Sequence, residues 1–190
     1  GRRTVNEDQI VIVLDILQGH VQLAFPVFGA DQFHGSTCQI CRGGQNVTVL
    51  GGDDCLFCKM LTYEKEQKKR VAAETEHFMA ITPYAGRFPY ELWLAPKAHQ
   101  RDFGDMNDEE RADLAQLLWD MLQKVTKLKE DVGYNICVMD GPRNRDFHWH
   151  IEILPRIGGF AGFEYATDCF ICMVSPERAA AFYRGEEITE

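Results

Sequence analysis

The sequence lacks any hydrophobic stretch long enough to cross a membrane. No apolar run approaches the roughly 20 residues that a transmembrane helix needs. No signal peptide is visible at the start of the chain, which reads Gly1-Arg2-Arg3-Thr4. We therefore expect a cytoplasmic protein with no membrane partner.

Positive charge is also scarce. The 20 Lys and Arg are outnumbered by 29 Asp and Glu, which gives a formal net charge of −9. Because affinity for nucleic acid depends on contacts between basic side chains and phosphates, this balance argues against nucleic acid as a partner. The longest basic stretch, residues 65–70, is interrupted by Glu66 and predicts a solvated turn.

Cysteine is well represented. At 190 residues, 45% of them hydrophobic, the chain can form one substantial core and a small additional module. Six of its seven cysteines form three C-x-x-C pairs: Cys38/Cys41, Cys55/Cys58 and Cys169/Cys172. This spacing favours metal ligands in a reducing compartment over a secreted disulfide scaffold. For the third pair we expect two buried or spare thiols on a strand.

Residues 146–156 hold the densest group of reactive side chains. Read as a strand, they place His148, His150 and Glu152 on one face and mainly aromatic and branched side chains on the other. Two imidazoles and a carboxylate on one strand face are typical of a metal-binding or catalytic surface cleft. Zinc prefers four tetrahedral thiolate or imidazole ligands, and Cys55, Cys58 and His99 are upstream to complete such a set with His148.

An alternative zinc site competes for the same thiols. Thirteen residues separate the pair Cys38/Cys41 from the pair Cys55/Cys58. This is the spacing of a four-cysteine zinc ribbon. One zinc ion cannot satisfy both arrangements, so Cys38 and Cys41 form either a second site or part of an alternative one.

Local patterns predict the remaining elements. Residues 9–25 read as a β-hairpin, and Asn107 caps a long amphipathic helix that ends at Gly133. Ser175 and Pro176 begin a short C-terminal helix. Further strands are expected at 70–74, 77–82, 90–95 and 134–139, and a glycine-rich loop at 158–163. Three arginines near the histidine strand could contact a phosphate: Arg143, Arg145 and Arg156.

Several of these segments together resemble the histidine-triad superfamily, in particular its galactose-1-phosphate uridylyltransferase branch. The resemblance rests on the Cys-Leu-Phe-Cys-Lys segment, the long helix and four further stretches, which are residues 94–99, 134–135, 147–156 and 161–164. Residues 54 to 184 are similar to the second of that family's two repeats.

The resemblance implies an α+β fold: an antiparallel half-barrel sheet crossed by one long helix. This domain would span residues 54–190, after a β-hairpin and zinc-binding segment at 1–53. A second repeat or a second subunit usually completes such a sheet, so we expect a homodimer. By the same resemblance, zinc is held by Cys55, Cys58, His99 and His148. His150 attacks the α-phosphate of a nucleotide sugar to form a nucleotidyl-histidine, and Asn135 helps to bind the substrate.

Two departures from the family pattern leave the function open. Only one repeat is visible here, and in the two-repeat enzymes a second-repeat sequence of this His-Trp-His-Ile-Glu kind has a structural or metal-binding role rather than a nucleophilic one. Glu152 stands where the catalytic repeat has glutamine, and an ionised carboxylate repels phosphate unless it is protonated or paired with a cation. The first hypothesis is a zinc-containing nucleotidyltransferase or nucleotide-sugar phosphorylase. The second, favoured by Glu152, is a noncatalytic zinc-stabilised module that binds a nucleotide or a protein. The third is an interaction protein in which residues 1–58 supply the binding surface.

Overall fold

The fold was analysed in a computed structural model. It describes residues 55–140, 147–159, 161–167 and 169–186. The predicted hairpin at 9–25 lies outside the described residues, as do Cys38, Cys41, Arg143 and Arg145. In the described part of the chain, no helix is long and apolar enough to cross a membrane.

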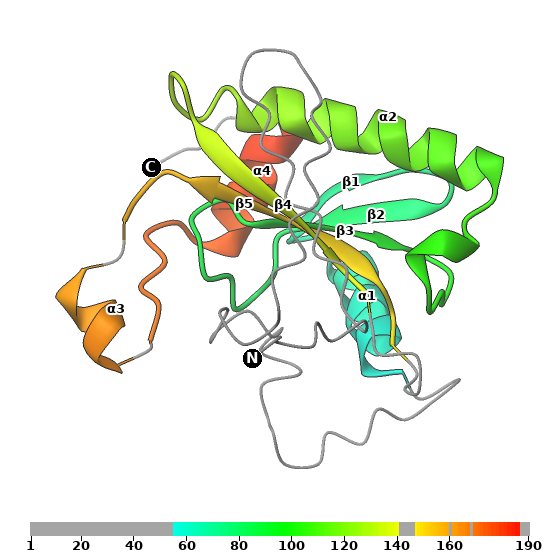
Figure 1. The fold of residues 1–190 in the computed structure, drawn as a ribbon, viewed down its shortest axis with the longest axis horizontal. Coiled ribbons are helices and arrows are strands. Elements are labelled where there is room, and N and C mark those ends of the chain that lie inside the picture. Colours follow the sequence, from blue (N-terminus) through cyan, green and yellow to red (C-terminus); the bar gives the residue numbers. More distant parts are fainter. Residues whose placement is uncertain (1–54, 141–146, 160, 168, 187–190) are drawn as a thin grey trace, which may run out of the picture.

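A five-stranded antiparallel sheet forms the centre of the domain, as the sequence predicts (Figure 1). Its strand order is β1-β2-β3-β5-β4, so the histidine strand β5 is inserted between β3 and β4. The strands are β1 (Val71–Glu74), β2 (Phe78–Ile81), β3 (Leu92–Pro96), β4 (Gly133–Met139) and β5 (His150–Arg156). The expected antiparallel sheet crossed by one long helix is confirmed.

The long helix α2 (Asp108–Val125) lies across one face of this sheet (Figure 1). The Asn107 side chain accepts a hydrogen bond from the Glu110 backbone N–H at 2.9 Å, and the Glu110 carboxylate accepts from the Asn107 N–H. This capping box satisfies two backbone donors that the first turn leaves unpaired. The helix ends at Val125 rather than at Gly133, and Gly133 opens β4 instead.

Loss of the Asn107 cap should weaken the domain measurably. We expect Asn107→Ala to lower the free energy of unfolding by about 1 kcal/mol, because the Glu110 N–H loses its acceptor. Urea denaturation followed by circular dichroism would measure this change. Asn107→Ser keeps a capping oxygen and should stay within a few tenths of a kcal/mol of the parent. Equal losses in the two variants would contradict a capping role.

Helix α1 (Leu56–Gln67) covers the opposite face of the sheet and was not predicted (Figure 1). Its buried Phe57 and Leu61 pack in one cluster with Met79, Ile81, Trp93 and Ala95 of β2 and β3. The prediction of a solvated turn over residues 65–70 is therefore wrong in two respects. Residues 65–67 belong to the last turn of α1, and Arg70 is buried.

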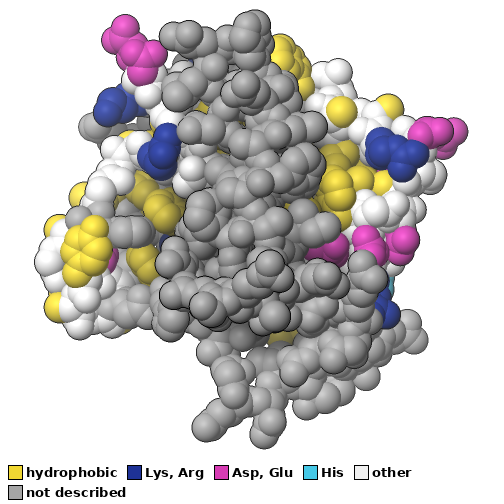
Figure 2. Space-filling model, viewed as in Figure 1, with side chains coloured by type: hydrophobic (Ala, Val, Ile, Leu, Met, Phe, Trp, Pro, Cys, Tyr) yellow, Lys and Arg dark blue, Asp and Glu magenta, His cyan; other side chains and the backbone are white. Residues whose placement is uncertain are grey.

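Two short helices follow the sheet. Helix α4 (Pro176–Arg184) packs against β1, and its predicted Ser175 cap is confirmed, since the serine hydroxyl accepts from the Arg178 N–H. Helix α3 (Gly162–Thr167) has no buried residue and occupies part of the predicted glycine-rich loop. Figure 2 shows hydrophobic side chains at the surface on the side where Figure 1 places α3, and Phe163 and Tyr165 are both exposed.

Candidate metal centre and histidine site

The polar face of β5 is buried, not open to a surface cleft as the sequence suggested. His148, His150 and Glu152 are at most 2% exposed, because α1 covers this face of the sheet. The alternation itself is as predicted, since Trp149, Ile151 and Ile153 pack in the separate core cluster beneath α2. The polar face therefore lies in an enclosed environment.

Four potential metal ligands converge at the start of α1. Cys55 is the N-cap residue, Cys58 lies in the first turn, His99 follows β3, and His148 precedes β5. One ligand atom from each lies within 4.8 Å of the others. The Cys58 Sγ atom is 3.3 Å from His99 Nδ1 and 3.2 Å from His148 Nδ1. The sequence thus anticipated a group that the fold brings together from three separate segments.

The hydrogen bonds around this Cys/His cluster suit a metal ion. His148 Nε2 lies 2.9 Å from the Pro96 carbonyl oxygen, which can only accept, so Nε2 carries the proton. The lone pair of His148 therefore resides on Nδ1, which faces Cys58. A carbonyl that fixes the tautomer of a ligating histidine is a regular feature of zinc sites, and two thiolates with two imidazoles are a common structural zinc set. The residues present thus fit zinc.

His150 is enclosed by aromatic rings. Its ring centroid lies 4.7 Å from that of Phe57 and 5.1 Å from that of Trp93. His150 Nδ1 is 3.3 Å from the His148 carbonyl oxygen, an acceptor that again favours a proton on Nδ1. The other ring nitrogen, Nε2, faces Glu152 Oε1 at 3.7 Å, and neither atom has a hydrogen-bond partner among the described residues.

Glu152 is paired with a buried cation, Arg87, that the sequence reading missed. Arg87 Nη2 donates to Glu152 Oε2 at 2.5 Å and to Glu91 Oε1 at 3.2 Å. Burial alone would raise the pKa of Glu152, but His150 and Arg87 outweigh it and hold that pKa below its usual value. Burial alone would likewise lower the pKa of Arg87, but the two carboxylates raise it. We conclude that Glu152 is ionised and balanced by Arg87.

The thiol of Cys137 borders the same site from β4. Cys137 stands opposite Glu152 in the register of β4 and β5. Burial, reinforced by the negative charge of Glu152, raises the pKa of this thiol to about 11. A thiol with such a pKa is protonated and unreactive at neutral pH, so Cys137 is a packing residue here.

The other predicted site residues lie farther along the sheet. Asn135 is opposite Leu154, one position beyond Glu152 on the same face. Arg156 is six residues from His150, about 20 Å along a strand, and its guanidinium covers Gly133. The structure therefore groups Glu152 with His150 but leaves Asn135 and Arg156 away from the imidazole.

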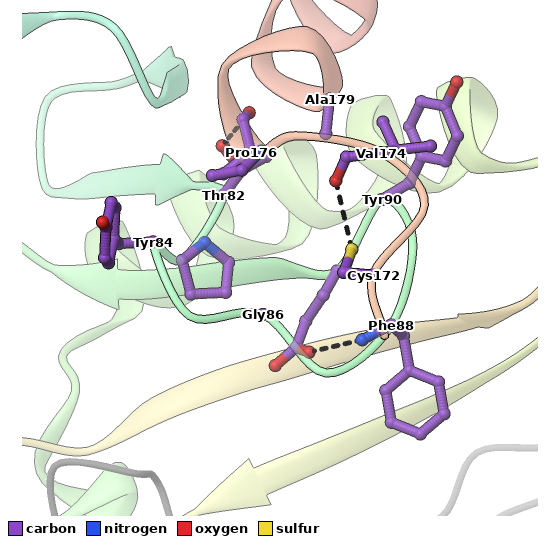
Figure 3. Close-up of a pocket in the computed structure, with 11 residues that line it drawn as sticks. Thr82, Tyr84, Gly86, Phe88, Tyr90, Cys172, Val174, Pro176 and Ala179 are labelled. Atoms are coloured by element: carbon purple, nitrogen blue, oxygen red, sulfur yellow. Dashed lines mark hydrogen bonds between the residues drawn. The ribbon is translucent and has the colours of Figure 1, made fainter. Parts of the chain in front are cut away.

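The third cysteine pair does not fit its prediction. Cys169 and Cys172 are exposed and lie in the irregular segment between α3 and α4, not buried on a strand. Cys172 donates a hydrogen bond from Sγ to the Val174 carbonyl. It lines a small pocket of about 30 Å³, partly open to solvent, between residues 82–91 and the start of α4 (Figure 3). Glu91 lines the same pocket, which is separate from the Cys/His cluster.

The family model and the relatives found by sequence comparison agree on one protein family. The sequence model of "Galactose-1-phosphate uridyl transferase, C-terminal domain" matches residues 43–156, more than half of the chain. The chain is 34% identical over 141 residues to ADP-glucose phosphorylase of Arabidopsis thaliana, which covers 71% of this chain and 39% of the relative. It is 33% identical over 146 residues to galactose-1-phosphate uridylyltransferase of Thermotoga maritima, which covers 70% of this chain and 45% of the relative.

Solved structures agree with these relatives. The crystal structure of Arabidopsis thaliana ADP-glucose phosphorylase with bound ADP-glucose matches with a TM-score of 0.59 and 32% identity, over 69% of this chain and 47% of that one. A zinc-bound histidine-triad protein of Mycobacterium smegmatis shares the fold, with a TM-score of 0.50 and 21% identity over 70% of this chain and 91% of that one. The chain spans less than half the length of the two curated relatives. With the sheet order, the Cys/His cluster and these matches together, the chain belongs to the galactose-1-phosphate uridyl transferase family and corresponds to its C-terminal domain.

Proposed function

We propose that the protein is a zinc-containing nucleotidyltransferase or phosphorylase that acts on nucleotide sugars. In this reaction His150 Nε2 attacks the α-phosphorus of the nucleotide sugar and forms a nitrogen–phosphorus bond. The bond from that phosphorus to the bridging oxygen breaks, and the sugar phosphate leaves with the electron pair. An oxygen of phosphate or of another sugar phosphate then attacks the same phosphorus and releases the imidazole.

The observation that carries this proposal is the orientation of His150. Its Nδ1 lies 3.3 Å from the His148 carbonyl oxygen, and a proton on Nδ1 would leave the lone pair on Nε2, the atom that must act as the nucleophile. Family membership supplies the substrate class, since its relatives include a phosphorylase named for ADP-glucose and a uridylyltransferase. Zinc bound by Cys55, Cys58, His99 and His148 would fold the segment around His150 without entering the chemistry.

A second candidate function is a noncatalytic zinc-stabilised module that binds a nucleotide or a protein partner. A specific observation favours it: His150 is fully buried, and its Nε2 faces the ionised Glu152 carboxylate at 3.7 Å. A phosphate entering there would meet two carboxylates, Glu152 and Glu91, and one cation, Arg87. Under this alternative, His150 forms no bond to phosphorus. The expected homodimer stays a prediction in both cases.

The experiment that separates these functions is intact-mass spectrometry of the zinc-loaded protein after incubation with a panel of nucleoside diphosphate sugars. We expect a mass gain equal to one nucleoside monophosphate, and we expect His150→Asn to abolish it while zinc content is unchanged. His77→Asn is a matched control on a partly exposed histidine and should retain the gain. A folded, zinc-loaded parent that gains no mass would favour the noncatalytic module.

A further inference from the structure

The connection between β2 and β3 is organised around one buried carboxylate, that of Glu91. Glu91 Oε2 accepts hydrogen bonds from the backbone N–H groups of Arg87 at 2.6 Å and Phe88 at 3.2 Å, and Figure 3 draws the second as a dashed line at Phe88. Glu91 Oε1 accepts from Trp93 Nε1 at 2.9 Å and from Arg87 Nη2 at 3.2 Å. This one side chain therefore fixes both the backbone and the guanidinium of Arg87.

Two side chains that Glu91 holds by hydrogen bonds, Trp93 and Arg87, define the surroundings of His150. The first is Trp93, whose ring centroid lies 5.1 Å from that of the His150 imidazole. The second is Arg87, which donates a hydrogen bond to Glu152 Oε2. The other oxygen of Glu152, Oε1, faces His150 Nε2. The ring of His150 is thus bounded on two sides by groups that Glu91 holds in place.

The charges of this cluster require Arg87. Arg87, Glu91 and Glu152 are 7%, 3% and 1% exposed, so neither carboxylate is stabilised by bulk water. With Arg87 in place, one cation contacts both anions. Without it, two like charges would remain buried in one cluster, and Glu152 would have to be protonated or displaced from His150.

We infer that Arg87 is a positioning residue for His150 and that it acts through Glu152. Arg87 keeps Glu152 ionised and orients its Oε1 atom toward the imidazole of His150. Arg87 thereby allows a glutamate to occupy this position of β5, where the catalytic repeat has glutamine. A catalytic role for this alignment rests on the proposed function of His150. The alignment itself is a property of the fold and can be measured without turnover.

The kinetic test compares Arg87→Met, Glu152→Gln and the double variant in the zinc-loaded protein. For Arg87→Met we expect the rate of nucleotidyl adduct formation at saturating nucleotide sugar to fall by about 10- to 100-fold, with little change in the half-saturating concentration. Adding Glu152→Gln removes the buried charge that faces His150, while Glu91 keeps its backbone and Trp93 donors, so most of that rate should be restored. A double variant as slow as Arg87→Met would show that Arg87 does not act through Glu152.

A spectroscopic test keeps the positioning role separate from the proposed function. In protein labelled with ¹⁵N-histidine, Arg87→Met should shift the His150 ring signals, leave those of His148 in place, and regain the parent pattern on addition of Glu152→Gln. Arg87→Lys keeps the charge but replaces the planar guanidinium whose Nη2 contacts both carboxylates, so it should fold and give a smaller shift. An unmoved His150 signal in both Arg87 variants would overturn the inference. A shift in a protein that forms no adduct would uphold positioning and refute only the catalytic role.

Discussion

Replacement of both Cys55 and Cys58 by serine should abolish zinc binding and unfold most of the domain. The two thiols provide half of the Cys/His cluster, and they anchor the start of α1, the helix that covers one face of the sheet. Structural zinc contributes directly to folding, by about 10 kcal/mol or more in small zinc domains. That is comparable to the entire stability of a typical domain, roughly 5–15 kcal/mol. Metal analysis and circular dichroism of the purified variant would measure both losses.

The exposed cysteine pair provides a matched control. Cys169→Ser with Cys172→Ser changes the same number of thiols outside the cluster, so zinc content should be unchanged and stability should shift by about 0.5 kcal/mol or less. Cys38→Ser with Cys41→Ser tests the competing zinc ribbon. Metal that is lost in this variant belongs to a ribbon or a second site. Metal that survives replacement of Cys55 and Cys58 would contradict the proposed ligand set.

Elements defined by local chemistry were predictable from the sequence. The α2 helix has a capping residue at Asn107 and an apolar stripe of period 3.6, and α4 begins with the Ser-Pro pair expected of a helix start. Helix α1 escaped prediction because its most conspicuous residues, Cys55 and Cys58, suggested a metal-binding turn. Its second half, residues 62–67, holds no aliphatic side chain, and only Phe57, Leu61 and Glu64 of the helix are buried, so the sequence shows no clear apolar stripe.

The candidate site was predictable only where its residues belong to recognisable sequence motifs. Cys55, Cys58, His99 and His148 were grouped because zinc has recognisable preferences for ligand type and because the motifs resemble a known family. Arg87 offered no such signal, since its partner Glu152 is 65 residues away and only the sheet brings them together. The acid at position 91, between Tyr90 and Leu92 in an otherwise hydrophobic stretch, was the one local hint of a buried polar network.

Arg70 shows how much stability such an unpredicted contact can carry. Its guanidinium donates twice to Glu64 Oε1, at 3.0 and 2.8 Å, and once to Glu177 Oε1 at 2.8 Å, which joins α1, β1 and α4. Glu64 is only 3% exposed, so Arg70→Met would leave a buried carboxylate without a cation. We expect the free energy of unfolding to fall by about 3 kcal/mol or more. Urea denaturation of the zinc-loaded protein, monitored by circular dichroism, would measure the loss.

Two companion variants identify the cause of that loss. Lys69→Met removes a neighbouring positive charge from an exposed side chain and should change stability by about 0.5 kcal/mol or less, so net charge alone would be excluded. Arg70→Met combined with Glu64→Gln leaves no buried charge without a partner, since Glu177 is exposed to water, and should regain part of the stability because the penalty comes mainly from the buried Glu64 carboxylate. If Arg70→Met unfolds at the same urea concentration as Lys69→Met, the buried pair contributes nothing, and packing of α1 and α4 against the sheet must supply the connection instead.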